Sequence, residues 1–180
     1  MLAVRVRKLP IVDLLSLLLI VVIGVDLIQV NRRLHRIETE RIGDDLDGAR
    51  MLPMPARTLA LQPVTIASGA PRLIFYMSPG CGVCAKNMPL WAATAQSVGR
   101  QNVLILVADD QWAEAVPAYL AKYNMAEFPV VVAERDFVKR YAMHEIPRTV
   151  LVRDDGKVEH VWRGTIAAPA VVAAWNSLRK

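Results

Sequence analysis

Residues 72–84 read RLIFYMSPGCGVC, an apolar run that ends at a Ser-Pro-Gly turn and leads directly into two cysteines, Cys81 and Cys84. A short apolar run bounded by turn residues predicts a buried strand. Beyond Cys84, apolar residues recur at helical spacing as far as Gly99, and they include Met88, Leu90, Trp91, Ala95 and Val98. The two cysteines are therefore expected at the junction between a strand and a helix.

The alternation of strands and helices continues to the C-terminus. Apolar runs and turn signals predict further strands at residues 58–61, 64–66, 103–108, 130–133, 149–152 and 158–162, and helices at 111–123, 137–141 and 167–178. The last two strands flank Asp154-Asp155-Gly156, which predicts the turn of an antiparallel hairpin. Parallel units followed by a hairpin and a final helix predict an α/β fold, a three-layer sandwich over residues 58–180.

The spacing of the cysteines points to redox chemistry. Two cysteines separated by two residues can bridge each other, and the first then faces unpaired amides at the start of the helix. Those amides stabilise a thiolate, so Cys81 is the predicted attacking sulfur and Cys84 the one that resolves the mixed disulfide. The alternatives are a structural disulfide or half of a metal site. However, so short a loop adds little stability, and the three histidines are remote in sequence. We predict catalytic residues Cys81 and Cys84, no metal and no cofactor.

A second candidate site lies at Ile146-Pro147, just before the strand predicted at residues 149–152. A cis peptide bond here would turn the chain sharply and leave backbone groups of Ile146 free to pair with an extended substrate peptide. An ordinary trans bond is the alternative, because only about 5–6% of X–Pro bonds in folded proteins are cis. Ile146 and Pro147 are the candidate substrate-binding residues.

The N-terminal part of the chain differs in composition. Residues 9–30 are almost wholly apolar, and a helix of about 22 residues spans a hydrocarbon core of roughly 30 Å. A cleavable signal peptide is the alternative, but the run is longer than usual and no small-residue cleavage site follows it. The sequence predicts a cytoplasmic N-terminus and a single transmembrane helix in residues 1–30, a juxtamembrane stalk and linker in residues 31–57, and the globular domain in residues 58–180.

The net charge of +5 is accounted for by the flanks of this apolar segment. Basic residues stand on both sides of it, at Arg5, Arg7, Lys8, Arg32, Arg33 and Arg36. Their placement favours a lipid bilayer over nucleic acid as the partner. Because both flanks are basic, the positive-inside rule leaves the orientation open. The cytoplasmic N-terminus is expected from the chemistry, because a domain that manages structural disulfides belongs in an oxidising compartment.

Residues 75–84, with Pro89 after them, resemble the active-site strand and helix of membrane-anchored thioredoxin-like proteins. Residues 141–152 and Asp155-Gly156-Lys157-Val158 are similar to the cis-proline segment and hairpin of that family. The resemblance runs from about residue 58 to the C-terminus. It is nearest to the methylamine-utilisation accessory proteins of the MauD type, with the TlpA, ResA and DsbE group next.

The resemblance implies a thioredoxin-like fold, a cis bond at Ile146-Pro147 beside Cys81, and thiol–disulfide exchange with a protein substrate. It also implies a single-pass protein of the cytoplasmic (inner) membrane whose C-terminal domain is periplasmic, an oxidising compartment that suits disulfide chemistry. For the MauD type it implies maturation of an amine dehydrogenase with a disulfide-rich subunit, and a membrane-embedded electron donor or acceptor is the expected redox partner. A cytochrome c maturation-type disulfide reductase and a non-catalytic scaffold subunit of a membrane complex are the alternatives.

The chain departs from the family pattern around the cysteines. Many relatives carry an aromatic residue immediately before the first cysteine and a Glu three residues after the second, where this chain has Gly80 and Asn87. Phe75 stands where thioredoxin has a buried Asp. No acid is therefore identified to take the proton of Cys84, and water or an unassigned acid is expected in that role.

Overall fold

The computed structural model describes residues 19–30 and 46–179. The chain divides into two compact units, residues 1–41 and 42–180. In the first unit, residues 19–30 form a helix. Within the described ranges, no helix combines the length and the apolar character needed to cross a membrane. Residues 9–18 of the expected transmembrane segment, and residues 31–45 of the expected stalk and linker, lie outside the described residues.

The second unit is built on one seven-stranded mixed sheet with the order β2-β1-β5-β4-β3-β6-β7. The strands are β1 (Met54–Arg57), β2 (Pro63–Ile66), β3 (Arg72–Met77), β4 (Val103–Val107), β5 (Val130–Ala133), β6 (Arg148–Val152) and β7 (Val158–Arg163). β3, β4 and β5 run parallel, whereas β6 is antiparallel to β3 and β7 is antiparallel to β6. The loop that follows β3 and carries the cysteines therefore emerges between β4 and β6.

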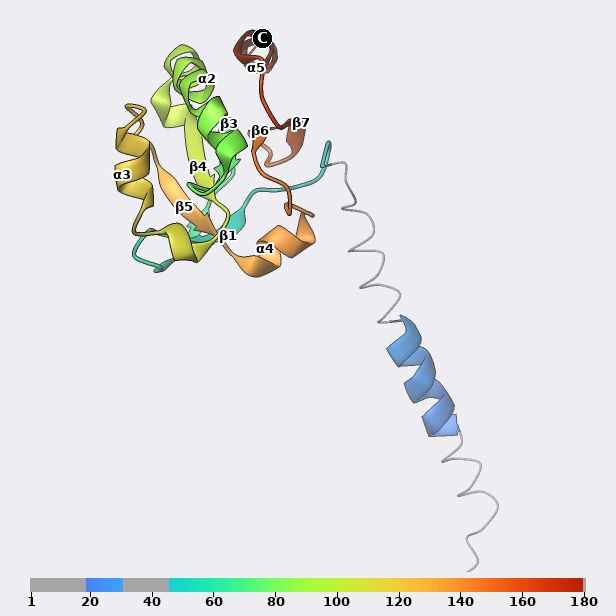
Figure 1. The fold of residues 1–180 in the computed structure, drawn as a ribbon. Helices are drawn as coiled ribbons and strands as arrows, with labels where there is room; N and C mark the ends of the chain where they lie inside the picture. Colours follow the sequence, from blue (N-terminus) through green and yellow to red (C-terminus); the bar gives the residue numbers. More distant parts are fainter. Residues whose placement is uncertain (1–18, 31–45, 180) are drawn as a thin grey trace, which may run out of the picture. The chain divides into compact units, whose positions relative to one another are not determined.

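Helices cover both faces of the sheet. They are α2 (Gly82–Val98), α3 (Val116–Ala121), α4 (Arg135–Arg140) and α5 (Ala168–Ser177), with short 3-10 turns η1 (Arg100–Asn102) and η2 (Asp110–Trp112). Buried residues of α2, α3 and α5 share one core cluster, whereas Phe137 of α4 belongs to a second cluster. Figure 1 shows α2 and α4 on opposite sides of the strands. The predicted three-layer α/β sandwich is confirmed.

The central strand β3 shows why its sequence is apolar throughout. Successive side chains of a strand point to opposite faces. Leu73, Phe75 and Met77 enter the cluster under α2, and Ile74 and Tyr76 enter the cluster under α4. Both faces are covered, so all five side chains are buried.

The folded unit begins earlier than the boundary expected at residue 58. β1 pairs with both β2 and β5, although it falls in the expected linker. Just before it, the side chains of Leu46, Met51 and Leu52 are at most 1% exposed and belong to the cluster under α4. The acidic residues, glycines and prolines of this segment suggest a linker, but a few apolar side chains spaced between them are enough to anchor it to the sheet.

Two other predicted elements differ in detail from the structure. Residues 58–61, expected as a strand, form a tight turn between β1 and β2, in which the Leu61 amide donates to the Thr58 carbonyl over 2.9 Å. The helix expected over residues 111–123 is divided into η2 and α3. The Asp109 carboxylate accepts a hydrogen bond from the Gln111 amide and so begins η2 as a separate turn.

Candidate active site

Cys81 lies at the N-terminus of α2, where it is the N-cap residue. Its Sγ atom accepts a hydrogen bond of 3.1 Å from the Cys84 amide, one of the amides that have no partner within the helix. Cys81 and Cys84 are joined in a disulfide, and their Cα atoms are 5.2 Å apart. Because the positive end of the helix dipole and an N–H group both face Sγ, the position favours a thiolate at Cys81 when the bridge is reduced.

The two sulfurs differ in accessibility. Cys84 is 0% exposed and belongs to the core cluster under α2, whereas Cys81 is partly exposed. A partner disulfide can therefore reach Cys81 but not Cys84. The structure thus distinguishes the two sulfurs by their access to solvent.

The loop before β6 lies against the disulfide. The Ile146-Pro147 bond is cis, as the family resemblance implied. The Ile146 carbonyl oxygen is 4.0 Å from Cys81 Sγ. Among residues 46–179, the Ile146 amide has no backbone hydrogen-bond partner, whereas the Pro147 carbonyl accepts from the Gly164 amide over 3.0 Å. The backbone of Ile146 is thus left open beside Cys81.

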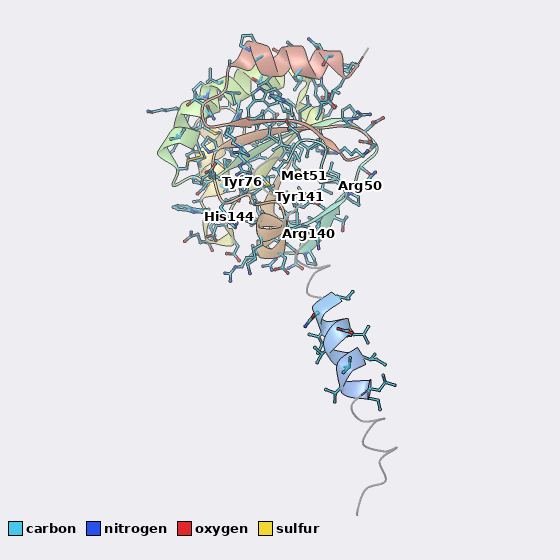
Figure 2. The ribbon with its side chains drawn as sticks, turned by 90° about the vertical axis from the view of Figure 1, so that its right-hand side faces the viewer. Arg50, Met51, Tyr76, Arg140, Tyr141 and His144 are labelled. Atoms are coloured by element: carbon cyan, nitrogen blue, oxygen red, sulfur yellow. A yellow bond between two sulfur atoms is a disulfide. The ribbon has the colours of Figure 1, made fainter. Side chains whose placement is uncertain are left out.

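Tyr76 holds this loop to the strand that leads into the cysteines. Its hydroxyl donates a hydrogen bond of 2.9 Å to the buried Met143 carbonyl. Burial raises the pKa of Tyr76 to about 12 despite the opposing charge of Arg148, so the hydroxyl keeps its proton. Tyr141, labelled with Tyr76 in Figure 2, belongs to the same buried cluster, and its own hydroxyl donates to the Arg50 carbonyl over 2.5 Å. The segment before β1, the cis-proline loop and β3 are tied together in this way.

The active-site helix is tied to β6 and to the β7–α5 loop. The Trp91 indole N–H donates to the Thr149 hydroxyl over 2.7 Å, and the ring stacks on Phe75 with 5.0 Å between centroids. The side-chain amide of Asn87 donates to the Gly164 carbonyl over 2.7 Å, and its oxygen accepts from the Ile166 amide over 3.2 Å. Asn87, one turn after Cys84, therefore joins α2 to the β7–α5 loop through two hydrogen bonds and supplies no carboxylate.

The sequence did not indicate the neighbour of Gly80. A Cβ atom placed on Gly80 would lie 2.7 Å from Cζ2 of Trp112, which belongs to η2. Trp112 is partly buried and packs on the same core cluster as Cys81 and Ile146. The signal available in the sequence was the glycine immediately before Cys81, because a glycine can mark the close approach of another group.

Two ionisable side chains stand close in sequence to the candidate site residues. Lys86 and His144 are exposed. His144 lines a cavity of about 440 Å³ together with Asp109, Glu134 and Lys139, and neither Cys81 nor Ile146 lines it. Within residues 19–30 and 46–179, no three His, Cys, Asp or Glu side chains are grouped in a way that could hold a metal ion.

Solved structures share this architecture. A secreted disulfide oxidoreductase of Mycobacterium tuberculosis, described as homologous to E. coli DsbE, superimposes with a TM-score of 0.58 at 21% identity, covering 72% of this chain and 99% of that chain. The thio-disulfide isomerase of Thermus thermophilus gives a TM-score of 0.57 at 23% identity, with coverages of 73% and 96%. The domain has the thioredoxin-like fold.

StoA from Bacillus subtilis matches the same thioredoxin-like domain with a TM-score of 0.55 at 17% identity, covering 70% of this chain and 98% of that chain. No protein-family model matches the sequence, and a search of curated proteins finds no relative. Identities this low establish the shared fold. The chemistry of the thioredoxin-like domain has to be argued from its own residues.

Proposed function

We propose that this protein is a thiol–disulfide oxidoreductase in which Cys81 attacks the partner disulfide and Cys84 resolves the mixed disulfide. The observation that carries the proposal is the geometry of the pair: a partly exposed Cys81 at a helix N-terminus, a buried Cys84, and the open Ile146 backbone 4.0 Å from Cys81 Sγ. The solved structures of similar fold include one described as a disulfide oxidoreductase and one described as a thio-disulfide isomerase, which supports the same class of chemistry here.

In the reducing direction, the Cys81 thiolate attacks one sulfur of the partner disulfide, and the other sulfur leaves as a thiolate. The Cys84 thiol then loses its proton, and its thiolate attacks Cys81 Sγ and releases the second partner sulfur. The Cys81–Cys84 bridge forms as the partner disulfide breaks, so two electrons pass to the partner. The same steps in reverse oxidise a partner dithiol.

The buried Cys84 needs a route for its proton. The amide of Asn87 is engaged at both ends by the β7–α5 loop, so this side chain takes no proton. We assign the transfer to water, which carries the Cys84 proton to the departing partner thiolate. In this direction the pair supplies one proton, that of Cys84, because Cys81 reacts as a thiolate; the first partner sulfur leaves as a thiolate and the second leaves with the Cys84 proton.

Ile146 and Pro147 are the proposed substrate-binding residues. An extended partner segment beside Cys81 can pair with the Ile146 amide as a short added strand. Backbone pairing of this kind is largely independent of side-chain identity, so it suits a protein that acts on several cysteine-containing segments.

We also propose that the domain is tethered to the cytoplasmic membrane and acts outside the cytoplasm. The support is the apolar run of residues 9–30 between two basic flanks, together with the secreted protein of the same fold. Maturation of a periplasmic redox enzyme with a disulfide-rich subunit is the matching task, and a membrane-embedded electron donor or acceptor is the matching redox partner. The resemblance to the MauD type is what favours this substrate over cytochrome c maturation.

Trapping of the mixed disulfide tests the assignment of the two sulfurs. In Cys84→Ser, the partner should remain linked to Cys81, and a band that disappears on reduction should accumulate in non-reducing gels. Cys81→Ser is the matched control and should trap nothing. Equal trapping by the two variants would refute the roles, and a failure of both to trap any partner would favour the scaffold function.

The same Cys84→Ser variant tests the location, because Cys81 is then the single thiol of the chain. A membrane-impermeant maleimide should label Cys81 in intact spheroplasts at the same rate as in lysed ones. Labelling that requires lysis would place the domain in the cytoplasm.

A further inference from the structure

We propose that Trp112 is a specificity-determining residue of the active site: its indole forms an apolar wall beside Cys81 and favours partner segments that carry an apolar side chain next to the reacting cysteine. The inference rests on the proposed thiol–disulfide exchange and names the class of partner segment. It is carried by the packing of Trp112 on Gly80.

The indole takes the space in which a side chain at position 80 would lie. A Cβ atom on Gly80 would be 2.7 Å from Cζ2 of Trp112, closer than Cβ atoms approach other atoms in folded proteins, and 3.0 Å from Cη2, which is also a tight contact. Gly80 is not among the residues with positive φ, so its backbone would accept a side chain. The neighbouring indole, and not the backbone, therefore requires glycine immediately before Cys81.

Hydrogen bonds fix the turn that carries Trp112. The two oxygens of the Asp109 carboxylate accept hydrogen bonds from the backbone amide and the side-chain amide of Gln111, at 3.1 and 3.0 Å. The Ala115 amide donates to the Trp112 carbonyl over 2.9 Å, and the Ala108 amide donates to the Met77 carbonyl over 2.9 Å. The second bond joins the ends of β4 and β3, so the indole is presented in a fixed position relative to the cysteine loop.

The residues near the disulfide that a partner can reach are largely apolar. Cys81, Trp112 and Ile146 are partly exposed and pack on the same core cluster, and Val83, two residues after Cys81, is 43% exposed. A partner disulfide in line with Cys81 Sγ meets the Ile146 backbone and this apolar surface. An apolar side chain beside the partner cysteine is removed from water by the contact, whereas a small polar one gains nothing.

The test compares two short disulfide-linked peptides that differ only in having Phe or Ser next to the reacting cysteine. The measured quantity is the ratio of kcat/KM for the Phe peptide to kcat/KM for the Ser peptide. For the wild-type chain we expect a ratio clearly above one. In Trp112→Ala the ratio should fall about three- to tenfold, the range expected for losing one aromatic contact.

Relocating the indole provides an independent readout. Gly80→Trp alone should lower the melting temperature, because two indoles compete for one space. Gly80→Trp combined with Trp112→Ala should fold better than either single variant and should recover part of the preference for Phe. If Trp112→Ala does not fold, Trp112→Leu keeps an apolar side chain in the core contact and is measured in its place.

Tyr123→Leu is the matched control, because Tyr123 is a partly buried aromatic residue that packs on the same cluster after α3. Its ratio should equal that of the wild-type chain. An unchanged ratio in the Trp112 variants, or a wild-type enzyme with no preference for Phe, would overturn the proposal and leave the exchange reaction intact. No exchange with either peptide would refute both the proposed function and this inference.

Discussion

At the scale of single residues, Tyr76 connects two parts of the candidate site that are 67 positions apart. It precedes the cysteine loop by one residue of β3, and its hydroxyl holds the Met143 carbonyl in the loop that ends at the cis proline. Tyr76→Phe leaves this buried carbonyl without its partner, which costs about 1–3 kcal/mol of stability. Urea unfolding at pH 7 measures the loss. A change below about 0.5 kcal/mol would show that the hydrogen bond is unimportant for stability.

The same hydroxyl makes stability depend on pH. Burial raises the pKa of Tyr76 to about 12 from the value of about 10 that applies in the unfolded chain. Because the folded-state pKa is the higher one, the contribution of neutral Tyr76 is complete below about pH 10 and is lost as the pH rises toward 12. Unfolding free energies at pH 8, 10 and 11 should therefore decline less steeply in Tyr76→Phe than in the wild-type chain. Burial also raises the pKa of Tyr119 to about 12, so part of the decline should remain.

Asn87 is a second residue whose hydrogen bonds predict the effect of a substitution. Asn87→Asp keeps an acceptor for the Ile166 amide but replaces the donor to the Gly164 carbonyl with a second acceptor. We expect a loss of about 1–3 kcal/mol at pH 7, because two oxygens then face each other in a buried site. Protonation of the introduced carboxyl restores a donor, so the difference from the wild-type chain should shrink as the pH falls toward 4. A pH-independent difference would contradict this account.

At the scale of elements, the β6–β7 hairpin and the segment before β1 depend on each other. The Met51 and Leu52 amides both donate to the Gly156 carbonyl, and the Gly48 amide donates to the Val158 carbonyl. A Cβ atom on Gly156 would meet the Leu52 carbonyl oxygen well inside van der Waals contact. The turn glycine therefore serves the hairpin and also the docking of the N-terminal segment.

Gly156→Ala should consequently destabilise the domain more than a turn substitution usually does. Gly164→Ala is the matched control: both glycines have positive φ, 84° and 71°, but a Cβ atom on Gly164 would meet nothing within 4 Å. We expect Gly164→Ala to cost about 1–2 kcal/mol through backbone strain alone and Gly156→Ala clearly more. Thermal unfolding followed by circular dichroism compares them. Equal melting temperatures would mean that the Leu52 contact is relieved without cost.

At the scale of the whole molecule, the structure moves the start of the folded domain toward the N-terminus. A chain of residues 58–180 lacks β1 and four large buried apolar side chains, Leu46, Met51, Leu52 and Met54. Each large apolar side chain contributes about 1.5–3 kcal/mol when buried, so together they are comparable with the usual total stability of about 5–15 kcal/mol. A chain of residues 46–180 should unfold cooperatively, whereas residues 58–180 should lack a cooperative transition. Matching urea midpoints for the two chains would contradict the importance of the segment.

Much of the fold is accessible from local patterns. β3 and β5 lie where their apolar runs predict them, and the Asp154-Asp155-Gly156 turn joins two strands as expected. These elements can be predicted because the signals for them, hydrophobic runs and turn residues, are contiguous in the chain. The position of Cys81 at a helix N-terminus follows from the same local pattern.

Contacts between distant segments could not be predicted in this way. Three such contacts depend on which strands become neighbours in the sheet. They are the hydrogen bond of Asn87 to the Gly164 carbonyl, the hydrogen bond of Tyr76 to the Met143 carbonyl, and the packing of Trp112 on Gly80. A sequence pattern reports whether a side chain is buried but not what it meets, because the partner is chosen by the packing of the whole sheet and its helices. The residues that carry the chemistry were therefore apparent from sequence, and the residues that position them and shape their surroundings became apparent only in the folded domain.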